Sequence, residues 1–101
     1  MTDVELSNYL KNNYNIKFPV AYIHFVNNFI KLDKNLKNTQ THHICPRCCG
    51  GKDEPFNLAK ITFNHHRKLH QLILKTEGLN KEQRKKLKFA YKKMKGELSK
   101  I

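Results

Sequence analysis

The sequence predicts an α+β fold in which a small β-hairpin and the helix that follows it are flanked by further helices. Two short β-compatible segments surround a Gly- and Pro-containing loop, and a stretch of helical periodicity comes directly after them. Apolar residues also recur every three or four positions in the segments before and after this unit, as on one face of a helix. Five of the six histidines lie within residues 41–74, so we expect the functional site there.

The central unit is predicted to run strand, loop, strand and helix. Residues 41–45 are β-compatible, and residues 46–56 carry turn-forming Pro, Gly and Asp. Residues 57–61 can return as a second strand. From about Asn64 the apolar spacing changes to that of one helix face, with Leu69, Leu72 and Ile73.

Two helices are predicted ahead of this unit, within residues 1–40. The first begins at a capping box, with Thr2 as the N-cap and Glu5 three residues later, and ends within residues 12–15. Pro19 fits the first turn of the second helix. One apolar stripe on that helix comprises Tyr22, Phe25, Val26, Phe29 and Ile30. His24 lies off this stripe as a surface histidine without an evident partner, and residues 31–40 form a polar connector.

Residues 77–101 are predicted to form a basic C-terminal helix. Asn80 and Gln83 have the spacing of an N-terminal cap. One side of the helix is apolar, with Leu87, Ala90, Tyr91, Met94 and Leu98, and most other positions are Lys or Arg. We expect this helix to pack on the domain and to contact phosphates.

The chain is strongly basic, with a formal net charge of +12 on 101 residues. Such a field favours a polyanionic partner and makes affinity fall with salt. No apolar run approaches the roughly 20 residues that cross a bilayer, so no membrane partner is expected. Three cysteines, an odd number, without a signal peptide favour reduced thiols and a cytoplasmic location.

The histidine spacing indicates a metal site. His66 and His70 are four residues apart on the predicted helix, so their side chains lie on one face with Cβ atoms about 5–6 Å apart. A third ligand can come from His42 or His43 on the hairpin. Neighbouring strand residues point to opposite sides, so one of the pair is expected to bind metal and the other to stay free as a candidate base.

In order and spacing, this segment resembles the HNH, or ββα-metal, nuclease motif of phage-type homing endonucleases. That motif has a His-His-Ile-x-Pro-Arg strand, a Gly-Gly loop, an Asn-Leu-x-x-Leu-Thr strand and a His-x3-His helix. The matching residues here are His42-His43-Ile44-Cys45-Pro46-Arg47, Gly50-Gly51, Asn57-Leu58-Ala59-Lys60-Ile61-Thr62, and His66 with His70. The resemblance assigns residues 41–76 to the nuclease motif.

The resemblance implies a role for each matching residue. His43 would be the general base that takes a proton from the attacking water, and Asn57 would stiffen the loop that aims it. His42, His66 and His70 would hold one divalent ion. Imidazole ligands favour Zn, Ni, Mn or Co over Mg, which prefers oxygen ligands. The expected cofactor is one divalent ion, which can be Mg, Mn, Zn or Ni. His65 stands where Glu is common in the family, and we assign it no catalytic role.

The function expected from this resemblance is metal-dependent hydrolysis of DNA, by nicking or cutting, in a homing endonuclease of phage or mobile-element origin that works in the host-cell cytoplasm. A homodimer or a partner protein would supply specificity. The candidate DNA contacts are Arg47, Arg67, Lys68, Lys85 and Lys92. Two alternatives stay open: a non-catalytic HNH-derived nucleic-acid-binding module, and a structural zinc module that uses Cys45 and Cys48 with two histidines.

Overall fold

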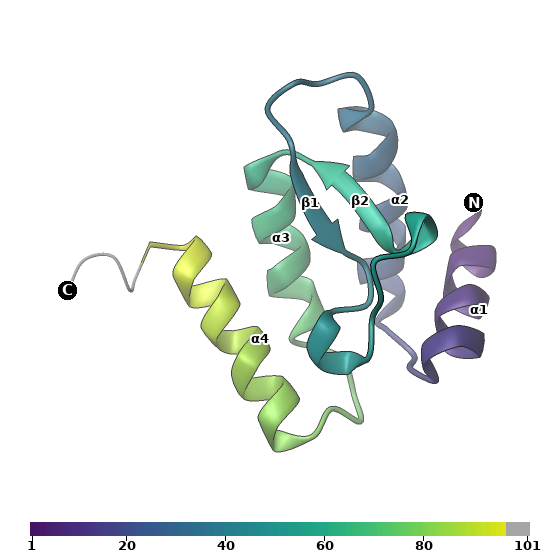
Figure 1. Cartoon of the computed structure of the whole chain (residues 1–101), viewed down its shortest axis with the longest axis vertical. Coiled ribbons are helices and arrows are strands. Elements are labelled where there is room, and N and C mark those ends of the chain that lie inside the picture. The colour runs from purple at the N-terminus through teal and green to yellow at the C-terminus, as the bar shows by residue number, and fades with distance from the viewer. Residues whose placement is uncertain (97–101) are drawn as a thin grey trace.

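The computed structural model describes residues 1–96 and contains four α-helices around one two-stranded antiparallel sheet (Figure 1). The elements are α1 (Asp3–Tyr14), α2 (Val20–Asp33), β1 (Gln40–His43), the 3-10 turns η1 (Arg47–Cys49) and η2 (Pro55–Asn57), β2 (Leu58–Ile61), α3 (Phe63–Ile73) and α4 (Lys81–Met94). This mixture of helices and a small sheet is compatible with the predicted α+β class. None of the described helices is both long and apolar enough to cross a membrane.

The hairpin pairs β1 with β2, with His42 opposite Ala59 and His43 opposite Leu58. Both strands are slightly shorter than predicted. The Ile44 N–H still donates to the Asn57 carbonyl at 2.9 Å, but the Cys45 N–H donates to the side chain of Asn57 instead of a strand backbone. The ladder therefore ends where the Asn57 side chain takes over the backbone pairing.

The loop after β1 turns closely against the strand it leaves. Gly51 lies so near the residues just after β1 that a Cβ atom there would sit 1.8 Å from the Cys45 carbonyl oxygen. Any side chain at position 51 would therefore displace the backbone. The lack of a side chain at Gly51 therefore lets the loop fold back against Cys45, just past the end of β1.

The two N-terminal helices form as the sequence predicts. Thr2 and Glu5 make both hydrogen bonds of the capping box of α1, and Asn15 ends the helix in the left-handed conformation with φ of 54°. The apolar stripe of α2 faces the core, where Tyr22, Val26 and Phe29 are buried. These side chains pack beside the buried face of the hairpin and α3, so α2 forms the back of the central unit.

The connector prediction is wrong at its start, because α2 continues to Asp33, which is 2% exposed. Its Oδ2 atom accepts from the Thr62 N–H at 2.8 Å and lies 2.7 Å from His65 Nδ1. The His65 ring also stacks on Phe29 with centroids 3.9 Å apart. Burial alone would raise the pKa of Asp33, but the hydrogen bonds from Thr62 and His65 lower it, so the carboxylate joins the end of α2 to the start of α3.

His24 is exposed as predicted, but the expectation that it lacks a partner is wrong. Its Nδ1 atom lies 3.0 Å from Asp3 Oδ2, and its Nε2 atom lies 3.0 Å from Asn28 Nδ2. The sequence could not predict this contact because Asp3 is 21 positions away, on α1. His24 therefore helps to join α1 to α2.

Helix α4 packs on α3 at the opposite end of the molecule from α1 (Figure 1). Asn80 and Gln83 form the predicted capping box. Of the predicted apolar stripe, Leu87 is buried, Ala90, Tyr91 and Met94 are partly buried, and Leu98 lies outside the described residues. Arg84 donates to the carbonyls of Leu74 and Thr76 at 2.9 and 3.0 Å, which fixes the α3–α4 loop.

Candidate metal centre and cleft

His42 on β1 and His66 and His70 on α3 converge on one point. One ring nitrogen from each lies within 4.8 Å of the other two, and the ring centroids are 4.7–5.2 Å apart. His66 Nε2 and His70 Nε2 are 3.1 Å apart, because a four-residue spacing stacks the two side chains one helical turn apart. β1 packs against this face of α3 and brings His42 to the pair.

The donor chemistry of this cluster fits a cation. Burial lowers the pKa of all three imidazoles, to about 4 for His70 and well below the ordinary value for His42, so the rings are neutral near pH 7. Neutral rings expose nitrogen lone pairs, which are what a divalent ion needs. His42 is 1% exposed, and its buried Nδ1 atom has no hydrogen-bond partner. An unpartnered buried nitrogen is unfavourable, and a bound cation would satisfy it.

His43 lies beside the cluster but is held by a different group. Its Nε2 atom lies 2.7 Å from Asp53 Oδ1 in the loop, and Arg47 Nη2 donates to both oxygens of the same carboxylate at 3.1 and 3.0 Å. Hydrogen bonds from His43 and then Arg47 lower the pKa of Asp53, so it is a carboxylate that accepts from Nε2–H. When the ring is neutral, the lone pair is then on Nδ1.

The sequence predicted Asp53 only as a turn residue. Its partner His43 lies ten positions away across a loop of irregular structure, and no periodic pattern reports such a contact. The available signal was an acidic residue in the loop that follows His43 and Arg47, although the path of the loop decides whether the three side chains meet.

Asn57 is fully buried and tied to the backbone on both sides of the loop. Its Oδ1 atom accepts from the Cys45 N–H at 2.7 Å, while Nδ2 donates to the carbonyls of Cys45 and Lys52 at 3.0 and 2.9 Å. These three bonds fix the end of β1 and the loop that carries Asp53. The side-chain amide therefore holds the two segments that position His43 and its carboxylate.

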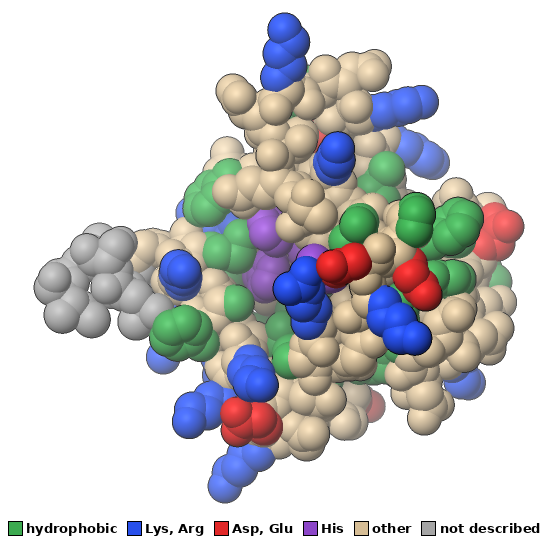
Figure 2. Space-filling view, in the orientation of Figure 1, with side chains coloured by type: hydrophobic (Ala, Val, Ile, Leu, Met, Phe, Trp, Pro, Cys, Tyr) green, Lys and Arg blue, Asp and Glu red, His purple; other side chains and the backbone are tan. Residues whose placement is uncertain are grey.

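The histidines line a cleft of about 310 Å³ between the hairpin and α4. Figure 2 shows histidine side chains at the bottom of a hollow on this face. Pro46, Arg47 and Cys48 form one wall, and Lys86, Leu87 and Ala90 of α4 form the other. Lys86 was not among the predicted contacts, because the helical pattern alone did not show which cationic residue faces the hairpin.

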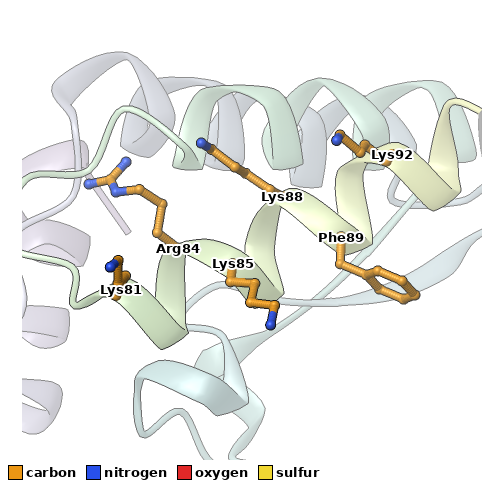
Figure 3. Close-up of a pocket in the computed structure, with 6 residues that line it drawn as sticks. All are labelled: Lys81, Arg84, Lys85, Lys88, Phe89 and Lys92. Atoms are coloured by element: carbon orange, nitrogen blue, oxygen red, sulfur yellow. The ribbon is translucent and has the colours of Figure 1, made fainter.

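The five predicted DNA contacts lie on different surfaces. Arg47 lines the histidine cleft, whereas Arg67 and Lys68 are exposed on α3, where Lys68 Nζ lies 5.9 Å from the centre of the Phe25 ring. Lys85 and Lys92 belong to a larger groove of about 460 Å³ on α4 (Figure 3). The residues lining it are Lys81, Arg84, Lys85, Lys88, Phe89 and Lys92. None of them lines the histidine cleft.

The three cysteines are free thiols. Cys45 is buried with its Sγ atom near the carbonyls of Pro46 and Cys49, and Cys48 Sγ lies 3.9 Å from Cys49 Sγ. Burial raises the pKa of Cys45 and Cys49 to about 12, which disfavours the thiolate that zinc binds. Within residues 1–96, Cys45 and Cys48 do not converge with two histidines as a zinc knuckle requires.

Parts of this chain are similar to three proteins of Enterobacteria phage T4. It is 45% identical to "Probable mobile endonuclease B" over 51 residues, which are 48% of this chain and 19% of that protein. It is 45% identical to "Probable mobile endonuclease D" over 47 residues, which are 45% of this chain and 18% of that protein. It is 44% identical to "Probable mobile endonuclease E" over 36 residues, which are 36% of this chain and 26% of that protein.

These matches cover about a fifth to a quarter of the length of the relatives. No family profile matches the chain, and no solved structure matches it. The proteins that this chain matches in part are thus named as mobile endonucleases, and three histidines of this chain could hold a divalent ion.

Proposed function

We propose that this chain is an HNH, or ββα-metal, endonuclease that hydrolyses DNA phosphodiester bonds with one divalent ion. The observation that carries the proposal is the convergence of His42, His66 and His70 in the cleft that also holds His43. The order β1, loop, β2 and α3 and the similarity to phage mobile endonucleases support it. A phage or mobile-element origin and the host-cell cytoplasm belong to the same proposal.

The three imidazoles would hold the ion and leave coordination positions for the phosphate, as catalytic sites with three protein ligands do. The bound ion would neutralise charge on the scissile phosphate in the transition state and stabilise the departing 3′ oxygen. Imidazole donors favour Zn, Ni or Mn, with Mg least suited to a set without oxygen ligands.

His43 would act as the general base. Asp53 accepts from Nε2–H at 2.7 Å and so leaves the Nδ1 lone pair to take a proton from the attacking water. Arg47 holds the Asp53 carboxylate from the other side. Asn57 keeps the loop in place and is a positioning residue, because its side chain contacts only backbone groups.

DNA would approach through the basic surfaces around the cleft. Arg47 and Lys86 lie on the two walls, next to the histidines. Arg67 and Lys68 are exposed on α3 outside the cleft and would contact more distant phosphates. On α4, four lysines at spacings of four, three and four residues form a line along the helix, which we name the lysine stripe: Lys81, Lys85, Lys88 and Lys92. Contacts from these residues to phosphates would position the chain without reading sequence, so a homodimer or partner protein would add specificity.

Incubation of supercoiled plasmid with Mg, Mn, Ni or Zn tests the proposal. The wild-type protein is expected to nick the plasmid, and His43→Ala to lower the rate by about 100-fold or more, the scale of lost general-base catalysis. His24→Ala is the matched control, because His24 is exposed on α2 and contacts Asp3. Failure of the wild type to cut with every metal, or a His43→Ala variant as fast as His24→Ala, would refute the proposal.

The second candidate is a non-catalytic HNH-derived DNA-binding module. It is favoured by the lysine stripe, which lies outside the histidine cleft and does not require it for phosphate contact. The two candidates predict the same DNA binding and differ in turnover. Tight binding of plasmid without nicking by any of the four metals would favour the binding module.

A further inference from the structure

The hydroxyl group of Tyr22 on α2 lies between the metal-site histidine of β1 and a backbone carbonyl. Its oxygen is 2.6 Å from His42 Nε2 and 2.7 Å from the Ile44 carbonyl oxygen. Tyr22 is 0% exposed and His42 is 1% exposed, so water does not compete for these contacts. Tyr22 lies on α2, outside residues 41–76, which the sequence assigned to the nuclease motif.

The positions of the hydrogen atoms between His42, Tyr22 and Ile44 follow from what each group can donate. A carbonyl oxygen only accepts, so the single phenolic proton of Tyr22 goes to Ile44. The Tyr22 oxygen can then only accept from His42, which places a proton on Nε2. A neutral imidazole carries one proton, so the His42 Nδ1 atom has the lone pair. That atom is buried and unpartnered, and it is the nitrogen left for a cation.

The opposite arrangement would place a lone pair against a lone pair. If His42 carried its proton on Nδ1, Nε2 would need to accept the Tyr22 proton, and the Ile44 carbonyl would face the oxygen of Tyr22 at 2.7 Å without a hydrogen between them. A buried carbonyl without a donor is unfavourable. The short distance to Ile44 therefore selects one tautomer of His42.

We propose that Tyr22 is a positioning residue of the metal centre, which fixes His42 in the Nε2–H tautomer and so presents the Nδ1 lone pair to the ion. The inference rests on the proposed metal site. A similar contact supports His66, whose Nδ1 atom lies 2.8 Å from Gln40 Oε1 and whose Nε2 atom points to His70. Groups that orient ligating histidines in this way typically change metal affinity by about 10-fold to 100-fold when removed.

Without the Tyr22 hydroxyl, nothing would hold the proton on Nε2. An Nε2–H group left in this buried position would have no acceptor, which disfavours the Nε2–H tautomer. In the metal-free protein, the Tyr22→Phe variant is therefore expected to gain the Nδ1–H form of His42. A metal ion would then need to displace that proton before it could bind.

The test compares Tyr22→Phe with Tyr9→Phe, which removes the same atom from a residue whose hydroxyl donates to Glu54 at 2.8 Å, away from the histidines. Long-range proton–nitrogen NMR of His42 in the metal-free proteins reports which ring nitrogen carries the proton. Calorimetric titration with Zn²⁺ gives the Kd. Wild type and Tyr9→Phe are expected to show Nε2–H and equal Kd values, whereas Tyr22→Phe shows Nδ1–H and a Kd weaker by about 10-fold to 100-fold.

A wild-type His42 with its proton on Nδ1 would overturn the inference, as would a Kd for Tyr22→Phe equal to that of Tyr9→Phe. The wild-type NMR measurement stands even if Tyr22→Phe does not fold. Absence of Zn²⁺ binding by the wild type would overturn the metal site and the role of Tyr22 in it, while the tautomer would still show whether Tyr22 orients His42. A wild-type protein that binds Zn²⁺ but does not nick plasmid would count against the proposed nuclease alone.

Discussion

Replacement of Asn57 by Ala tests how much of the loop depends on one buried amide. The substitution removes three hydrogen bonds and leaves the Cys45 N–H and C=O without partners in a residue that is 0% exposed. At about 1 kcal/mol for each bond, the loss in the free energy of unfolding is roughly 3 kcal/mol. A domain of this size has about 5–15 kcal/mol in total, so Asn57→Ala should remain folded but clearly destabilised.

Urea unfolding followed by circular dichroism measures this loss. With a slope of about 1.5 kcal/mol/M, the midpoint should fall by roughly 2 M. Asn27→Ala is the control, because Asn27 donates one hydrogen bond, to the half-exposed carboxylate of Asp3, and water can replace that bond. This variant should lower the free energy of unfolding by about 1 kcal/mol or less. At a temperature where both variants are folded, Asn57→Ala should also nick plasmid more slowly than Asn27→Ala. A loss below about 1 kcal/mol, or unchanged nicking, would refute the reasoning.

Three further predictions follow from the site and its charges. Asp53→Ala should nick plasmid more slowly than the wild type and bind Zn²⁺ with the same Kd, because it frees His43 Nε2 and leaves the metal ligands in place. Equal nicking rates for Asp53→Ala and the wild type would contradict this prediction. In the metal-free protein, the urea midpoint should fall as the pH drops from about 6.5 to about 4. Unfolded histidines take up protons near pH 6.5, whereas burial keeps the pKa of His70 in the folded protein at about 4. His70→Gln should reduce this fall, and a midpoint that does not change with pH would contradict the prediction. In DNA-binding titrations, changing the four lysines of the lysine stripe to Gln should make the slope of log K against log salt shallower by up to about 3.6. The control changes Lys11, Lys31, Lys34 and Lys37 to Gln, which removes the same charge. The slope of this control should stay nearly unchanged.

Local patterns predicted the elements of this fold well. The capping boxes at Thr2 and Asn80 form as expected because each is complete within four residues. The His66 and His70 pair meets on one face because helical geometry fixes that spacing. The approach of one histidine of the hairpin was also expected, since strand residues alternate between two sides, but the pattern left His42 and His43 open and only the family resemblance favoured His42.

Contacts between distant segments could not be predicted in the same way. Tyr22 was expected to be an ordinary core residue of an apolar stripe, and nothing in the sequence aims its hydroxyl at a histidine 20 positions away. Asp33 was assigned to a polar connector because aspartate is seldom buried, and only the approach of Thr62 and His65 makes its burial favourable. The direction of each α4 lysine also depends on where the helix docks, which is set by Leu87 and its neighbours.

The attachment of α2 at two places matters for any attempt to transplant this motif into another scaffold. One end of the hairpin–helix unit relies on the phenol of Tyr22, and the first turn of α3 relies on the carboxylate of Asp33. A graft of residues 41–76 alone would leave behind both supports. A transplanted segment therefore needs to begin no later than residue 19, so that α2 is included with the hairpin and α3.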